Sequence, residues 1–158
     1  MRHNKPDSYS DGFTLIELMI TLAIAALILS LAVPSLRDFT LRNNLAAKAN
    51  ELVSTLNYAR SEAVRRGETI TVTSNNGNAW EDGWQINDAD ANLLRTIDAM
   101  NGPTLAADTD TVQYLASGFT SAGASVTFTL CYEAGQPGRQ IEITATGRPA
   151  IDADYTCP

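Results

Sequence analysis

The sequence predicts an α+β protein in which one long N-terminal helix packs on an antiparallel β-sheet. The first observation is that residues 13–33 are largely apolar and contain one charged residue, Glu17, and that helical periodicity continues beyond them up to residue 66. The second is that the chain after Gly67 divides into short segments rich in β-branched residues, several of them alternating between apolar and polar. A helix followed by a run of strands is typical of the α+β class.

The apolar stretch at residues 13–34 is long enough to cross a membrane. At about 1.5 Å per residue, its 21 residues before Pro34 span roughly 30 Å, the thickness of a bilayer's hydrocarbon core. A carboxylate in that region costs about 2.5–3.5 kcal/mol, so Glu17 is a candidate functional residue. The run is too long for a secretory signal and no small-residue cleavage site follows it, but an uncleaved membrane anchor remains an alternative.

The second half of the helix, residues 35–66, is expected to cover a sheet. Apolar residues recur at spacings of three and four: Leu45, Ala49, Leu52, Leu56, Ala59 and Ala63. Arg65 and Arg66 occupy the last turn, where positive charge suits the helix dipole, and Gly67 is a plausible stop. Pro34 separates the two halves and predicts a kink, because it lacks a backbone donor.

The remaining segments are expected to supply the sheet. Strands are predicted at residues 69–73, 84–87, 93–97, 112–115, 125–132 and 139–145. The sequence AGQPG at residues 134–138 predicts a hairpin between the last two.

The polar leader, residues 1–12, ends in Gly12 and is followed by FTLIEL, which places Glu17 five residues into the apolar run. This arrangement resembles the processing site of the type IV prepilin superfamily. Later stretches are similar to the FimT/FimU/GspH group of minor pilins and pseudopilins: LNYARSEAVRRG at the helix end, WEDGWQI, LLRTID, and TLCYEAGQPGRQIEITATGRPAI followed by Cys157. The resemblance covers nearly the whole chain after the leader and implies a low-copy subunit that starts or caps a filament.

The resemblance also implies roles for individual residues. A prepilin peptidase would cut between Gly12 and Phe13, and the new Phe13 amine would be methylated. Glu17 would neutralise the N-terminal amine of a neighbouring subunit in the filament core, with a snorkelling acid near the interface as the alternative. Pro34 would mark where the helix bends during assembly, or would be an ordinary kink.

The cysteines and the charged residues limit the functions that the head can have. Cys131 and Cys157 are an even pair on the side expected to face an oxidising compartment, which suggests a disulfide; two reduced thiols are the alternative. From Gly67 onward there are three basic and twelve acidic residues, so the head repels nucleic acid overall. The sole histidine, His3, lies in the leader, and no catalytic pair or metal-ligand cluster stands out, so we expect no enzyme, cofactor or metal.

Three further stretches each allow a functional and a purely structural interpretation. The sequence DADAN at residues 88–92 has the acid spacing of a calcium loop but lacks its glycine and its glutamate, so a polar turn is favoured. Trp80 and Trp84 could form an exposed partner surface, but buried aromatics are favoured. Arg148 is a possible DNA contact, yet Ala150 stands where DNA-binding FimT-like proteins carry a second arginine, so a turn residue is favoured.

We therefore expect a leader (1–12), a transmembrane and filament-core helix (13–34), an amphipathic helical half (35–66) and a β-rich head (67–158). The favoured function is a minor type IV pilin of the FimU/FimT kind that primes pilus assembly and sits near the filament tip. The alternatives are a GspH-like pseudopilin of type II secretion and a DNA-binding minor pilin. Expected partners are other minor pilins and the major pilin (or pseudopilins), the prepilin peptidase and methylase, the inner-membrane assembly platform and, before assembly, membrane lipid; nucleic acid is not expected. The chain would span the bacterial inner membrane once, with its head in the periplasm, and after assembly would lie at the pilus tip on the cell surface or in a periplasmic pseudopilus.

Overall fold

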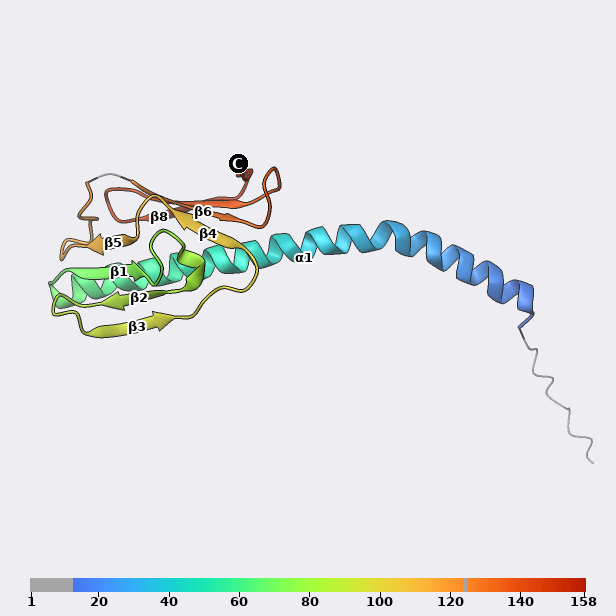
Figure 1. Ribbon diagram of the computed structural model, residues 1–158, viewed down its shortest axis with the longest axis horizontal. Helices are drawn as coiled ribbons and strands as arrows, with labels where there is room; N and C mark the ends of the chain where they lie inside the picture. The colour runs from blue at the N-terminus through green and yellow to red at the C-terminus, as the bar shows by residue number, and fades with distance from the viewer. Residues whose placement is uncertain (1–12, 124) are drawn as a thin grey trace, which may run out of the picture. The chain divides into compact units, whose positions relative to one another are not determined.

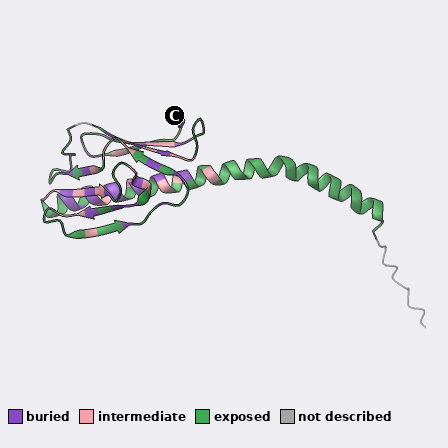
Figure 2. Ribbon diagram, in the orientation of Figure 1, coloured by how far each residue is buried: buried purple, intermediate pink, exposed green. Residues whose placement is uncertain are grey.

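The computed structural model describes residues 13–123 and 125–158, which form one helix, eight strands and a short 3₁₀ helix (Figure 1). Helix α1 (Leu15–Arg66) is continuous and contains Pro34. The chain divides into two compact units, Met1–Thr40 and Leu41–Pro158. Within α1, the residues of the first unit are all exposed, whereas those of the second include every buried residue of the helix (Figure 2).

The Leu41–Pro158 unit, called the head below, holds two four-stranded antiparallel sheets. The first has the order β3-β2-β1-β5 and comprises β1 (Ile70–Ser74), β2 (Trp84–Asn87), β3 (Leu93–Ile97) and β5 (Thr111–Tyr114). The second has the order β4-β6-β7-β8 and comprises β4 (Thr104–Ala107), β6 (Val126–Cys131), β7 (Arg139–Ile143) and β8 (Pro149–Asp152). The 3₁₀ helix η1 (Trp80–Asp82) lies between β1 and β2.

The core of the head lies where the apolar stripe of α1 meets the inward faces of both sheets. The six stripe residues predicted from the helical spacing are each at most 2% exposed. Strands β1 and β6 alternate between buried and half-buried positions, as expected for strands with one face against a core. The largest side chains of this cluster are fully buried: Trp80, Trp84, Tyr114 and Phe128.

The structure adds two strands and a sheet division that the sequence did not predict. Strands β4 and β8 lie at the edges of the second sheet, pairing with β6 and β7 respectively. Strand β8 begins with Pro149, which is tolerated there because an edge strand leaves one side unpaired. The remaining six strands lie within one or two residues of the predicted ranges.

Candidate functional site

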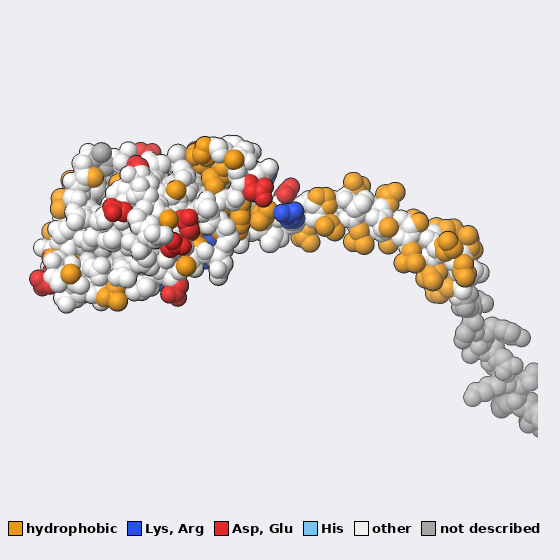
Figure 3. All heavy atoms as spheres, in the orientation of Figure 1, with side chains coloured by type: hydrophobic (Ala, Val, Ile, Leu, Met, Phe, Trp, Pro, Cys, Tyr) orange, Lys and Arg blue, Asp and Glu red, His pale blue; other side chains and the backbone are white. Residues whose placement is uncertain are grey.

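Every residue of the apolar part of α1 is exposed in the isolated chain (Figure 3). An 18-residue window within α1 has a mean hydropathy of 2.5 with none of its residues buried, so this segment could cross a membrane by length and composition. Exposed fractions of its large side chains run from 53% at Ile20 to 76% at Leu15. A continuous apolar surface of this kind requires lipid or other protein to cover it.

Polar groups inside this segment are bonded to the helix's own backbone. Thr21 Oγ1 donates to Leu18 O and Ser30 Oγ donates to Leu27 O, each at 2.8 Å. Hydroxyls satisfied in this way need no water, which suits a helix in lipid or in a dry filament core. Pro34 lies within the continuous helix, and the kink expected there stays a prediction.

Glu17 lies at the start of α1 in a reciprocal pair with Thr14. The Glu17 backbone N–H donates to Thr14 Oγ1 at 3.3 Å, and the Thr14 N–H donates to Glu17 Oε2 at 3.5 Å. This is a capping box, which satisfies two of the backbone donors left free at a helix N-terminus. The carboxylate of Glu17 therefore lies against the backbone of Thr14, one residue after Phe13. Gly12, the predicted cleavage position, lies outside the described residues.

The capping box was not anticipated, although its signal was present. The sequence TLIE at residues 14–17 has the spacing of a capping box, with a hydroxyl residue three positions before a glutamate. The helix consequently begins at Leu15, two residues later than predicted.

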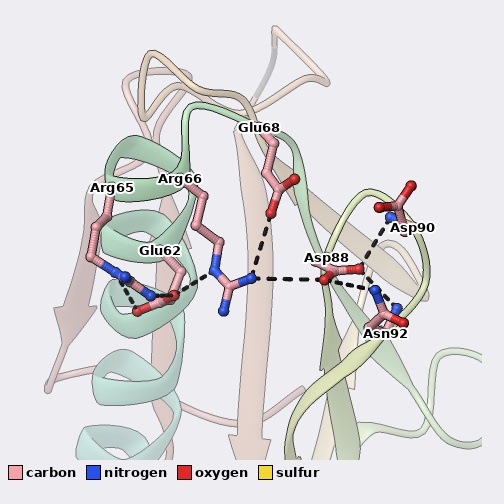
Figure 4. A network of polar contacts seen from close by, with 7 residues as sticks. All are labelled: Glu62, Arg65, Arg66, Glu68, Asp88, Asp90 and Asn92. Atoms are coloured by element: carbon pink, nitrogen blue, oxygen red, sulfur yellow. Dashed lines mark hydrogen bonds and ion pairs between the residues drawn. The ribbon is translucent and has the colours of Figure 1, made fainter.

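At the opposite end of α1, a network of charged residues ties the helix to the sheet (Figure 4). Glu62 accepts hydrogen bonds from Arg65 and Arg66, the latter at 2.8 Å between Arg66 Nε and Glu62 Oε2. These guanidinium groups hold the pKa of Glu62 below its usual value. Arg66 Nη1 also lies 3.7 Å from Glu68 Oε1 and 3.8 Å from Asp88 Oδ2. Arg66 thus links the last turn of the helix to the turn between β2 and β3.

Asp88 organises that turn rather than offering a cation site. Its Oδ1 accepts the backbone N–H groups of Asp90 at 3.1 Å and Asn92 at 2.8 Å, and its Oδ2 accepts Asn92 Nδ2 at 3.1 Å. The side-chain amide of Asn92 and then these backbone donors keep the pKa of Asp88 below its usual value. Both carboxylate oxygens are already engaged, which agrees with the interpretation of residues 88–92 as a polar turn.

A disulfide joins Cys131 at the end of β6 to Cys157, with Cα atoms 5.9 Å apart. Backbone bonds support it, because Gly135 N–H donates to Cys157 O and Cys157 N–H donates to Gln136 O. Gly138 is required beside it, since an added Cβ would lie 2.5 Å from Cys157 Sγ. The bridge attaches the C-terminal segment to the β6–β7 hairpin.

The tryptophans and Arg148 have different surroundings. Trp80 and Trp84 are fully buried, and Trp80 Nε1 donates to Thr109 O at 2.8 Å, so the hypothesis of an exposed aromatic surface is wrong. Arg148 is exposed at the end of the turn between β7 and β8, where its carbonyl accepts the Thr144 N–H at 3.2 Å. This is the turn position favoured from the sequence.

Comparison with known proteins places this architecture in a family. Residues 48–147 match the family model described as Type II transport protein GspH, and residues 7–33 match the prokaryotic N-terminal methylation motif. The chain belongs to the GspH family. Its methylation motif and the apolar half of α1 together mark a membrane-anchored, pilin-like protein.

Relatives and solved structures agree with this assignment. Two fimbrial proteins of Pseudomonas aeruginosa are each 41% identical over 59 residues, which cover 37% of this chain and 38% of each relative. Two crystal structures of the type IV minor pilin FimU from Pseudomonas aeruginosa have TM-scores of 0.65 and 0.62, at 29% and 26% identity. They cover 76% and 72% of this chain and 96% of each FimU chain. The predicted fold and the FimT/FimU/GspH group are therefore confirmed.

Proposed function

We propose that this GspH-family protein acts as a minor type IV pilin that primes pilus assembly and sits near the filament tip. The observation that carries the proposal is the exposed apolar half of α1 on a chain whose fold matches FimU. The helix would lie in the inner membrane before assembly, with the head in the periplasm. It would then enter the shared filament core beside other minor pilins and the major pilin.

The N-terminal residues would carry this assembly. A prepilin peptidase would cut the Gly12–Phe13 bond and methylate Phe13, as the methylation motif at residues 7–33 supports. In the filament, Glu17 would accept the positively charged amine of a neighbouring subunit, because two charges that are costly alone in a dry core neutralise each other. Its weak 3.5 Å contact with the Thr14 N–H leaves the carboxylate available for that stronger partner. Pro34 would give the helix a point at which to bend.

Incorporation into filaments tests this proposal. Glu17→Ala is expected to be processed normally and to be absent from pili sheared off the cell surface. Glu51→Ala is the matched control, since Glu51 is a half-exposed acid on the same helix whose salt bridge to Lys48 contributes at most about 1 kcal/mol. Equal amounts of wild-type protein and Glu17→Ala in sheared pili would refute the role given to Glu17.

The second candidate is a minor pseudopilin of type II secretion. The family model itself favours it, because its description names a type II transport protein. In that case deletion of the gene would reduce the secretion of exported proteins and leave surface pili unchanged.

A further inference from the structure

The head contains two Asn-Gly pairs, Asn76-Gly77 and Asn101-Gly102. An asparagine before glycine is chemically vulnerable, because a following residue without a Cβ lets its backbone nitrogen reach the asparagine side chain. We propose that Asn76 is a site of spontaneous deamidation in this protein and that the fold protects Asn101. Deamidation would slowly and irreversibly alter the turn after β1, which contacts both sheets.

The Gly77 nitrogen is accessible, while the Asn76 amide that it must attack donates through Nδ2 to Asp82 Oδ2 at 2.6 Å. Asn76 and Gly77 are exposed in the turn after β1, which is closed by a 3.0 Å hydrogen bond from the Ala79 N–H to Asn76 O. Gly77 has a φ of +53°, and no atom lies within 4 Å of the position that a Cβ would take. Among the backbone hydrogen bonds of the described residues, none uses the Gly77 N–H. The nitrogen that must attack is therefore open to solvent base.

The reaction needs only water and a base. The Gly77 nitrogen loses its proton to solvent and bonds to Asn76 Cγ, and the bond from Cγ to the amide nitrogen breaks. That nitrogen takes up a proton and leaves as ammonia, so a five-membered succinimide remains. Water then adds to either succinimide carbonyl and opens the ring, giving aspartate or isoaspartate at position 76. No oxidant, metal or enzyme is required.

Asn101 and Gly102 are exposed as well, but the second glycine packs against a neighbouring side chain. An added Cβ at Gly102 would lie 3.1 Å from Tyr132 Cε1 and 3.2 Å from Tyr132 Oη, so the Tyr132 ring packs against this glycine. Gly102 has a φ of +115°, and the next residue, Pro103, is buried. Movement of the Asn101-Gly102 backbone during ring closure would disturb the packing of Gly102 on the Tyr132 ring, so this contact opposes the reaction.

Deamidation of Asn76 would weaken the contact between the two sheets of the head. The Asn76 Nδ2 group donates to Asp82 Oδ2 at 2.6 Å, so the new carboxylate would lose this bond and face a like charge. The same turn connects the two sheets: Ala79 forms an isolated bridge with Ala106 of β4, and the Ala107 N–H donates to Asn78 O at 3.4 Å. An isoaspartate would also add a backbone atom within this turn.

Peptide mapping tests the proposal directly. The processed full-length protein in detergent is incubated at mildly alkaline pH and 37 °C, then reduced and digested with trypsin, which separates the two pairs into peptides 67–95 and 96–139. We expect the mass gain of about one dalton to accumulate several-fold faster in peptide 67–95, at Asn76, and expect similar rates at both pairs in a urea-unfolded sample. A faster gain at Asn101, or a ratio in the folded protein equal to that in urea, would overturn the proposal.

A matched pair of variants tests the structural consequence. Asn76→Asp is expected to lower the urea midpoint of unfolding more than Asn101→Asp, because only the first change places a carboxylate against Asp82. Equal urea midpoints for the two variants would overturn the predicted effect on the contact between the sheets.

Discussion

Removal of the disulfide should destabilise the head by an amount set by the loop that it closes. Cys131 and Cys157 are 26 residues apart. In the chain-entropy model, a loop of this length lowers the entropy of the unfolded chain by about 12 cal/mol/K, which corresponds to about 3.5 kcal/mol at 25 °C. For a head of roughly 120 residues, the average unfolding entropy per residue converts this loss to a fall in Tm of about 14 °C.

The assay is thermal unfolding of a soluble fragment, Leu41–Pro158, compared with its Cys131→Ala/Cys157→Ala double variant. Alanine is chosen because Cys157 is 4% exposed, and serine would bury an unpaired hydroxyl there. Reduction of the wild-type fragment should reproduce the shift, while the double variant should not respond to reductant.

A Tm change of less than about 3 °C would refute the loop-closure argument. It would mean that the backbone bonds of Gly135, Gln136 and Cys157 hold the C-terminal segment in place without the bridge.

Three further predictions concern processing, core packing and pH. Gly12→Ala should leave an unprocessed precursor about twelve residues heavier on a denaturing gel, and normal processing would count against the proposed cleavage site. Leu56→Ala should lower the free energy of unfolding by about 2–5 kcal/mol, because Leu56 is fully buried. Its control, Ser54→Ala on the exposed face of α1, should change the free energy of unfolding by less than about 0.5 kcal/mol. Urea titration of the two variants measures the difference. Glu62 and Asp88 have folded pKa values below their usual ones, so their contribution to the free energy of unfolding is present at neutral pH and is lost as the pH falls below about 4. The urea midpoint of unfolding, measured from pH 7 to 3, should therefore decrease below about pH 4. It should decrease less in Glu62→Gln, which lacks one of the two carboxylates.

Local patterns predicted most of the elements because their signals lie within short windows. The three- and four-residue spacing of the stripe from Leu45 to Ala63 identified which face of the helix is buried. Alternation in β6 and β7 identified two half-buried strands in the same way. The division into two sheets depends on which strands pair, and that information is not contained in any single window.

The missed strands show where local signals fail. Strand β4 has the sequence TLAA, whose alanines have little preference for strands, and β8 begins with a proline. Both are edge strands whose pairing with β6 or β7 fixes their conformation. Tertiary contacts thus decided these segments.

For the candidate site too, the sequence indicated local features but not contacts between distant residues. Glu17 stood out in the sequence because a single acid interrupts an apolar run, but its reciprocal hydrogen bonds with Thr14 were overlooked despite a recognisable spacing. The bridge from Arg66 to Asp88 joins residues that are distant in the chain, so no sequence pattern could reveal it.

The central claim, that this protein primes pilus assembly, is tested most directly by counting surface pili in a strain that lacks its gene. We expect pili to be lost or greatly reduced in the deletion strain, restored by the wild-type gene, and not restored by Glu17→Ala. Unchanged pilus numbers in the deletion strain would contradict the claim, and impaired protein secretion in the same strain would then identify a type II pseudopilin.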